Sequence, residues 1–357
     1  MSDAILQPFL MMTCQCGTEK FLKQEILERY HDFRFAYSRP GFVTFKVSEA
    51  WGKKTKIKVD SIFSRYCGLS LGRVQGVDQH ILAEKVWELA ASRTIDRIHL
   101  FPRDQAVPGE QGYEPGLTAE CFDAHRLLLE KKPPHLRLGM ASDCPDIAGE
   151  KHEQILDVIM ISPDEWWVGH HQIFDWRSAQ PGGLFAIKPP FDAISRAYLK
   201  FEEGLRWSGM PIRCGSRVLD IGAAPGGASQ ALLTRGAQVI GVDPALIHPT
   251  ILNYPGFCYL RSRINQTKRR HFRKVHWIVT DMNVAPNYTL DVLEELVTSN
   301  QMNIRGILFT LKLVKWELIA DIPYYIARIK SWGFRDLMVK QLQFNRQEIM
   351  VAARNIV

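Results

Sequence analysis

The stretch that most constrains the fold starts with a short apolar run at residues 218–221 and breaks into a turn of small residues at 222–227. Residues 228–233 then have the composition of a helix. In a parallel sheet, a strand, a glycine-rich turn and a helix present backbone N–H groups and a positive helix end at one sheet edge. The stretch therefore predicts an α/β fold with a site for a nucleotide-like ligand. A turn of small residues that serves packing alone is the plain alternative.

A second apolar run at residues 237–242 leads into Asp243. A carboxylate at this place commonly binds the hydroxyls of an adenosine ribose. The glycines do not follow Gly-x-Gly-x-x-Gly, so a dinucleotide is the weaker interpretation. Asp220 and Pro225 instead resemble the S-adenosylmethionine site of class I methyltransferases. The predicted cofactor-binding residues are Asp220, Gly222, Ala223, Ala224, Pro225, Gly226, Gly227, Asp243 and Asp281.

The 357 residues are too many for one typical domain. The net charge of +7 is unevenly distributed: residues 1–180 carry 22 Lys and Arg against 25 Asp and Glu, and residues 181–357 carry 23 against 13. The positive field thus lies with the half that contains the turn, which favours a polyanionic partner. No apolar stretch approaches the roughly 18 residues of a transmembrane helix, so no membrane partner is expected.

Seven cysteines are scattered along the chain, and Cys14 and Cys16 are too isolated to nucleate a zinc site. Reduced thiols in a cytoplasmic protein are expected, since no secretory signal is recognisable. His170 and His171 follow a predicted strand without further ligands, so we interpret them as structural. No metal site is predicted.

Three parts are predicted from the alternation of strand and helix patterns. Residues 1–48 predict a small ferredoxin-like α+β module, and residues 49–178 a second α+β module. From residue 185 to 357, strands alternate with helices and finish in a hairpin. This order predicts a Rossmann-like, mostly parallel doubly wound sheet with an antiparallel last strand.

Individual residues carry further expectations. Trp166 and Trp167 are expected in the core, although a tryptophan pair can also stack on bases. A helix is predicted over residues 195–207, with Glu202 and Glu203 in solvent.

Four charged residues fall where a ligand at the strand edge is within reach. Asp281 and Lys312 directly follow predicted strands, Glu348 enters the last strand, and Lys200 lies on the helix before the first. Residues just after parallel strands face the ligand in such a sheet. A single charged residue at the end of a strand more often simply faces solvent. Together with the glycine-rich turn, however, these four residues form a candidate catalytic set.

This set resembles the Lys-Asp-Lys-Glu tetrad of the FtsJ-like ribose 2′-O-methyltransferases, with Lys200, Asp281, Lys312 and Glu348 in the four catalytic places. Other segments resemble the RlmM-type branch of this family, namely residues 16–20, 190–200, 310–313 and 346–349, and the module 49–178 resembles its THUMP RNA-binding domain. The resemblance implies S-adenosylmethionine-dependent 2′-O-methylation of RNA. In this branch the target is a cytidine of large-subunit (23S) ribosomal RNA.

The chemistry needs a general base, because a ribose hydroxyl must lose its proton as it attacks the methyl group. Our hypothesis is that Lys312 is this base and that Lys200 disfavours its protonation. Asp281 and Glu348 would orient the two ammonium groups. The carboxylates act in the opposite sense on the lysine pKa, and the sequence leaves the sign of the balance open.

Residues 261–276 contain seven cations and no acid. Contacts with RNA phosphates are one interpretation, and a solvated loop is the other. Many class I enzymes carry an acid here for the adenine amino group, so adenine recognition by backbone groups is expected instead. The predicted RNA-binding residues are Arg261, Arg263, Lys268, Arg269, Arg270, Arg273 and Lys274.

Two other functions stay open from the sequence. One is methylation of a small molecule, and the other is RNA binding on the same fold without turnover. The tetrad, the basic C-terminal half and the two additional modules favour methylation of RNA.

Overall fold

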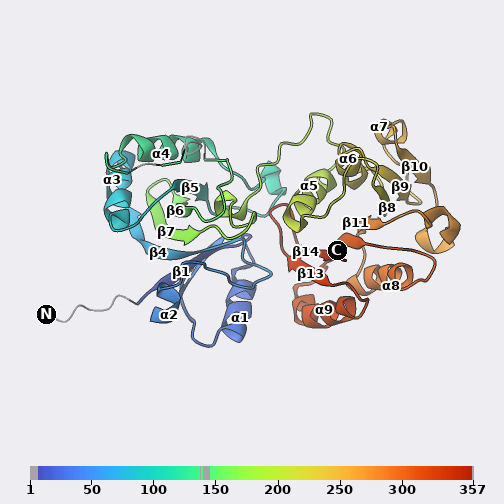
Figure 1. The fold of residues 1–357 in the computed structure, drawn as a ribbon, viewed down its shortest axis with the longest axis horizontal. Coiled ribbons are helices and arrows are strands. Elements are labelled where there is room, and N and C mark those ends of the chain that lie inside the picture. The colour runs from blue at the N-terminus through green and yellow to red at the C-terminus, as the bar shows by residue number, and fades with distance from the viewer. Residues whose placement is uncertain (1–6, 137, 140–144, 356–357) are drawn as a thin grey trace. The chain divides into compact units, whose positions relative to one another are not determined.

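The computed structural model describes residues 7–136, 138–139 and 145–355. The chain divides into two compact units, residues 1–186 and 187–357, and each combines a sheet with helices (Figure 1). Within the described ranges, no helix is both long enough and apolar enough to cross a membrane. Cys144 lies outside the described residues, and the other cysteines are free thiols.

The N-terminal unit contains one mixed sheet, which within the described residues has seven strands in the order β2-β3-β1-β4-β7-β6-β5. Strand β5 runs parallel to β6, and the other neighbouring pairs are antiparallel. The strands are β1 (Phe9–Thr13), β2 (Arg34–Arg39), β3 (Phe42–Lys46), β4 (Tyr66–Gln75), β5 (Arg97–Pro102), β6 (Gln154–Ser162) and β7 (Glu165–Gln172). The helices are α1 (Glu19–Arg29), α2 (Glu49–Gly52), α3 (Gln79–Ala90) and α4 (Ala119–Glu130).

Strand β1 lies between β3 and β4, so strands from the two predicted modules 1–48 and 49–178 share one sheet. The division of this unit into two modules stays a prediction.

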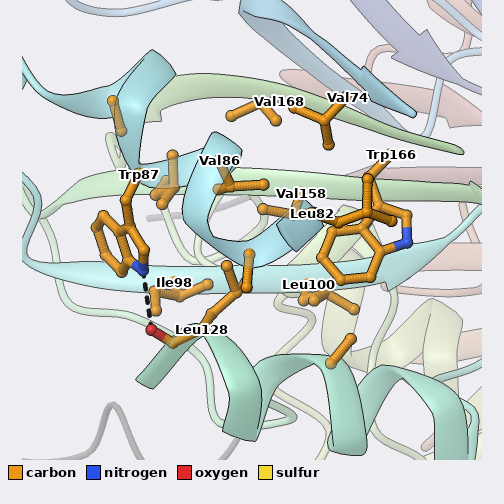
Figure 2. Close-up of a cluster of buried hydrophobic side chains, with 14 of the residues drawn as sticks. Val74, Leu82, Val86, Trp87, Ile98, Leu100, Leu128, Val158, Trp166 and Val168 are labelled. Carbon is orange, nitrogen blue, oxygen red and sulfur yellow. Dashed lines mark hydrogen bonds between the residues drawn. The ribbon is translucent and has the colours of Figure 1, made fainter. Parts of the chain in front are cut away.

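Helices α3 and α4 cover one face of this sheet and enclose an apolar cluster (Figure 2). Trp166 is completely buried there, as expected, and the indole of Trp87 donates a hydrogen bond to the carbonyl of Leu128 (2.9 Å). Trp167 points to the opposite face, because side chains alternate along a strand. It stacks on Tyr37 with 5.7 Å between ring centroids and packs, partly buried, against a second apolar cluster, so Trp166 lies inside a core and Trp167 at the margin of another.

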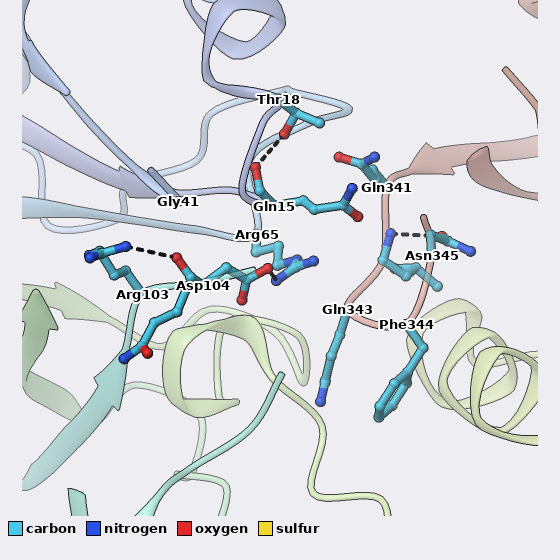
Figure 3. Close-up of polar contacts among 12 residues, drawn as sticks. Gln15, Thr18, Gly41, Arg65, Arg103, Asp104, Gln341, Gln343, Phe344 and Asn345 are labelled. Carbon is cyan, nitrogen blue, oxygen red and sulfur yellow. Dashed lines mark hydrogen bonds and ion pairs between the residues drawn. The ribbon is translucent and has the colours of Figure 1, made fainter. Parts of the chain in front are cut away.

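A buried ion pair anchors the loop that follows β5 (Figure 3). The guanidinium of Arg65 lies 2.5 Å from Asp104, and the hydroxyl of Tyr113 donates to the other oxygen of the same carboxylate (3.3 Å). The backbone carbonyl of Asp104 accepts a hydrogen bond from Arg103 (3.1 Å). These contacts give an irregular segment rich in proline and glycine a fixed start.

The C-terminal unit is the predicted doubly wound sheet. Within the described residues its strands are in the order β10-β9-β8-β11-β12-β14-β13, with β8 to β12 parallel and β14 antiparallel to both of its neighbours. The strands are β8 (Arg217–Ile221), β9 (Gln238–Val242), β10 (Phe257–Leu260), β11 (Trp277–Thr280), β12 (Gly306–Lys312), β13 (Asp336–Lys340) and β14 (Glu348–Arg354). The helices are α5 (Ala197–Ser208), α6 (Gly227–Leu233), α7 (Pro249–Leu252), α8 (Pro286–Val297) and α9 (Ile322–Lys330).

The expectation that Glu202 and Glu203 are solvated was wrong, because both are buried. The carboxylate of Glu203 accepts hydrogen bonds from the backbone N–H groups of Gln343 (2.8 Å) and Phe344 (3.0 Å), in the loop before β14. Glu202 forms ion pairs with two arginines. A buried carboxylate is tolerated when such partners replace water. The backbone N–H groups that pair with Glu203 lie some 140 residues further along the chain, so local sequence patterns do not reveal them.

We predict that Glu203→Ala destabilises the chain by about 2 kcal/mol or more, because two buried backbone N–H groups lose their acceptor. Urea unfolding of the full chain measures the change in the free energy of unfolding. Glu317→Ala, at an exposed position, is the matched control and should change stability by less than about 0.5 kcal/mol. Equal effects of the two substitutions would contradict the prediction.

Candidate active site

The turn between β8 and α6 requires glycine at several places. Gly222 (φ +74°) and Gly226 (φ +124°) have backbone angles that other residues rarely adopt. A Cβ atom on Gly227 would lie 2.2 Å from the hydroxyl of Ser195. The start of α6 and the residues before α5 therefore pack directly against each other, which brings α5 to the carboxyl edge of the sheet.

The four predicted catalytic residues form one network of ion pairs. The ammonium of Lys200 lies 3.1 Å from Asp281 and 2.8 Å from Glu348. The ammonium of Lys312 lies 2.6 Å from the other oxygen of Asp281 and forms a second ion pair with Glu348. All four side chains are largely buried, with at most 14% of each exposed. Two cations therefore alternate with two anions in a small, largely buried space.

Sheet register explains why these residues meet. Lys312 ends β12 directly opposite Glu348, which begins the antiparallel β14. Asp281 follows the parallel neighbour β11, and Thr310 of β12 donates a hydrogen bond to its carboxylate (2.6 Å). Lys200 reaches the same edge from α5. The strand ends thus bring together residues that are up to 148 positions apart in sequence.

The network also determines the protonation of its members. Burial alone would raise the pKa of Asp281, but the ammonium groups of Lys200 and Lys312 outweigh it and lower this pKa. Burial alone would lower the pKa of Lys312, but Glu348 and Asp281 outweigh it and raise this pKa. The sequence left open whether the neighbours raise or lower the pKa of Lys312. The structure shows that they raise it, so Lys312 is protonated at neutral pH without a ligand.

A cavity of about 480 Å³ connects this network with the turn. Its wall contains Lys200, Asp281, Lys312, Glu348 and the predicted cofactor-binding residues Gly222, Ala223, Ala224, Pro225 and Gly227. The wall further includes five polar residues that were not predicted as site residues, namely Ser195, Arg196, Asn283, Arg346 and Gln347. Asn283 follows β11 two residues after Asp281, and the other four lie in the segments 190–200 and 346–349 that carry the family resemblance.

Three predicted cofactor-binding residues lie outside this wall. Gly226 shapes the turn, and Asp220 lies beneath it, where Ser229 donates a hydrogen bond to its carboxylate (2.6 Å). Asp243 ends β9 and accepts hydrogen bonds from the backbone N–H groups of Ala224 (3.1 Å) and Ala245 (2.7 Å). Asp243 thus supports the turn and keeps free lone pairs for ligand hydroxyls.

The predicted RNA-binding residues do not form one patch. Arg261 and Arg263 follow β10 at the carboxyl edge of the sheet, and Arg261 donates to the carbonyl of Pro244 (3.4 Å) beside Asp243. Arg273 and Lys274 precede β11 and line a separate cavity of about 660 Å³ at the amino edge, together with Arg213, Arg217 and Arg305. Arg270 lines another cavity of about 500 Å³ together with Arg273 and Lys274, and Arg269 is ion-paired with Glu295. Lys268 directly precedes the short helical turn at Arg269–Phe272.

Residues 193–321 match the family model described as FtsJ-like methyltransferase. One similar protein is the Ribosomal RNA large subunit methyltransferase M of Thauera aminoaromatica, which is 30% identical over 55% of this chain and 55% of its own length. The chain thus spans about half the length of the first curated relatives that it matches.

A relative of the same name from Tolumonas auensis is 23% identical over 96% of this chain and 94% of its own length. Among solved structures, that of TrmN from Thermus thermophilus covers 98% of this chain and 100% of its own at 12% identity, with a TM-score of 0.36. A score this low carries no functional argument.

We predict that Asp220→Asn stabilises the chain at alkaline pH. Burial, opposed by Ser229, raises the pKa of Asp220 to about 7. A carboxyl group whose pKa is raised on folding lowers stability as the pH rises from its usual pKa to the raised one. The stability of the variant relative to wild type should therefore increase between pH 5 and pH 8, by on the order of 3 kcal/mol. Unfolding free energies at both pH values measure the effect. Glu317→Gln, at an exposed site, should show no such pH dependence.

Proposed function

We propose that this chain transfers the methyl group of S-adenosylmethionine to a ribose 2′-hydroxyl of large-subunit ribosomal RNA, and that the target nucleotide is a cytidine. The observation that carries the proposal is the single cavity lined both by the glycine-rich turn and by the network of Lys200, Asp281, Lys312 and Glu348. A methyl donor held on the turn would have its reactive end directed at these four charges.

The residues of the cavity suit both reactants. Backbone N–H groups of the turn and the start of α6 favour the carboxylate of the amino-acid part of the cofactor, and Asp243 favours hydroxyls. S-adenosylmethionine supplies an electrophilic methyl group on a sulfonium. The 2′-oxygen of the ribose forms a bond to the methyl carbon as the bond from carbon to sulfur breaks, and Lys312 takes the hydroxyl proton.

Lys312 has to lose its own proton before it can act as this base. Its raised pKa opposes that loss in the ligand-free network. A sulfonium next to Lys312 adds a positive charge, and nearby positive charge lowers the pKa of an ammonium group. Lys200 acts in the same sense from the other side of the two carboxylates. The cofactor would thereby prepare the base that its own methyl group requires.

The choice of RNA rests on two further supports. The relatives that match this chain are named for methylation of large-subunit ribosomal RNA. Residues 181–357 carry an excess of ten positive charges, and Arg261 and Arg263 lie at the edge where the cavity opens. Both features suit a polyanionic substrate.

Transfer of tritiated methyl groups from S-adenosylmethionine to 23S ribosomal RNA tests the function. Label in RNA, mapped to a ribose 2′-oxygen of a cytidine, is the expected result. Label on a base, or only in small molecules, would refute the proposed reaction. RNA binding without label would favour a binding protein of the same fold.

We predict that Lys312→Ala lowers kcat by about 100-fold or more, the usual contribution of a general base. Lys312→Arg keeps a cation for both carboxylates but no accessible neutral form, so its kcat should be similarly low. Lys330→Ala, at an exposed position of α9, should leave kcat unchanged. Wild-type kcat/KM should rise about tenfold per pH unit above neutrality, because kcat/KM reports the free chain, in which Lys312 is mainly protonated. Near-normal turnover by Lys312→Arg would disprove the assignment.

We predict that Arg261→Gln with Arg263→Gln weakens binding of a short single-stranded RNA that contains the target. Loss of two phosphate contacts should reduce the slope of log affinity against log salt by about 1.4. Arg273→Gln with Lys274→Gln removes the same charge at the opposite sheet edge, which a short RNA at the cavity does not reach. Filter binding at several salt concentrations compares the two. Equal losses would contradict a contact specific to the carboxyl edge.

A further inference from the structure

The N-terminal unit brings two histidines and one carboxylate together in its interior. His99 on β5, Asp157 on β6 and His171 on β7 lie on neighbouring strands, and their side chains point to the sheet face opposite α3 and α4. One ligand-type atom from each lies within 4.8 Å of the others. All three residues are buried, and His99 and Asp157 have no exposed surface.

Two of these residues form a hydrogen-bonded pair. The Nδ1 atom of His171 lies 2.6 Å from Asp157. The Nε2 atom of His171 lies 2.9 Å from the carbonyl of Ser178, and because a carbonyl only accepts, Nε2 carries a proton. The contact between Nδ1 and Asp157 is therefore held by a proton between the two atoms, and a metal ion in place of this proton would be ligated by Nδ1 and by the carboxylate. A backbone carbonyl that fixes a histidine in this way is typical of metal-ligating histidines.

The hydrogen bond between His171 and Asp157 does not explain why His99 is buried beside them. Among the described residues, neither of its ring nitrogens has a hydrogen-bond partner, and its Nδ1 lies 3.9 Å from Asp157, too far for a hydrogen bond. An imidazole offers a ring nitrogen as a ligand atom, and no hydrogen bond from the described part of the chain occupies either one here. A buried polar atom without a partner destabilises the fold.

We propose that His99, Asp157 and His171 bind a divalent transition-metal ion, with Zn²⁺ as the expected occupant. Two imidazoles and one carboxylate are a donor set that Zn²⁺ takes in proteins. Tetrahedral ligation places ligand atoms about 3.3 Å apart, at bond lengths near 2.0 Å. Asp157 lies 2.6 Å from His171 through one carboxylate oxygen and 3.9 Å from His99 through the other, and one ligand atom of each residue lies within 4.8 Å of the others. Side-chain rotations would bring the three atoms to this spacing.

The surroundings are buried, and a water molecule would take the fourth tetrahedral position beside the three protein ligands. Arg97, on the same face as His99, is neutralised by a two-fold contact with Glu153 (2.8 and 3.2 Å). Apolar clusters flank the three residues, with Phe101 and Ile159 in one and Ile155 and Ile173 in the other. The ion would link β5, β6 and β7 and satisfy the lone pair of His99. The site has no role in the proposed methyl transfer.

Metal content of the full chain, expressed without an affinity tag, tests the proposal. We expect close to one Zn²⁺ per chain by plasma mass spectrometry, and a higher thermal midpoint after refolding with Zn²⁺ than with chelator. His99→Gln should lose the ion. His170→Gln is the matched control: its neighbour in the register is Leu156 on the other face, so it should retain the ion.

Zinc well below one ion per chain, both as purified and after refolding with Zn²⁺, would overturn the proposal. So would unchanged zinc content in His99→Gln. If that variant does not fold, refolding of the wild-type chain with Co²⁺ decides, because Co²⁺ bound by nitrogen and oxygen ligands gives visible absorption bands. Their appearance supports the site, and their absence refutes it. Methyl-transfer activity enters none of these measurements.

Discussion

Antiparallel pairing of β14 with β12 sets the last residue of one strand, Lys312, against the first residue of the other, Glu348. Side chains alternate between the faces of a sheet, so a slip of one residue would turn Glu348 away from the edge where Lys312 lies. The slip is opposed because the residues of β14 that follow Glu348 are buried throughout, from Ile349 to Ala353. Apolar packing inside the sheet therefore fixes the distances among the charges at its edge.

The charges in turn depend on one another. Two ammonium groups and two carboxylates are nearly neutral together, which permits their burial, whereas any one of them alone would be costly. The same balance keeps Lys312 protonated in the ligand-free chain. Under the proposed function, the sulfonium is a third cation beside two anions, so cofactor binding and proton release become linked. The network keeps Lys312 protonated before the cofactor binds. This is consistent with a base that loses its proton only when S-adenosylmethionine is present.

Features encoded locally could be predicted from the sequence. The turn could be predicted because Gly222 and Gly226 adopt backbone angles that other residues rarely adopt. The positions of Asp281 and Lys312 could be predicted because they stand at the ends of apolar runs that form strands. Parallel strands bring such ends to one edge, which is why the four charged residues could be expected to meet.

Features that depend on distant partners could not be predicted. Glu203 is buried because a loop some 140 residues later supplies two N–H groups. The basic segment looks continuous in sequence, yet Arg261 and Arg273 lie at opposite edges because the segment crosses the sheet between β10 and β11. His171 looked isolated because its neighbours His99 and Asp157 come from other strands.

The proposed reaction and the proposed substrate rest on different observations, and either can stand without the other. Methyl transfer to a hydroxyl is argued from the cavity, where the turn and the two lysines face one space. Ribosomal RNA as the substrate is supported by the names of the relatives and by the positive charge of residues 181–357. Neither observation concerns the groups that would react. A change of RNA target would alter the residues around Arg261 and Arg263 and leave the network intact. Loss of the network would instead abolish the reaction on every substrate, because the same four residues would handle the proton in each case.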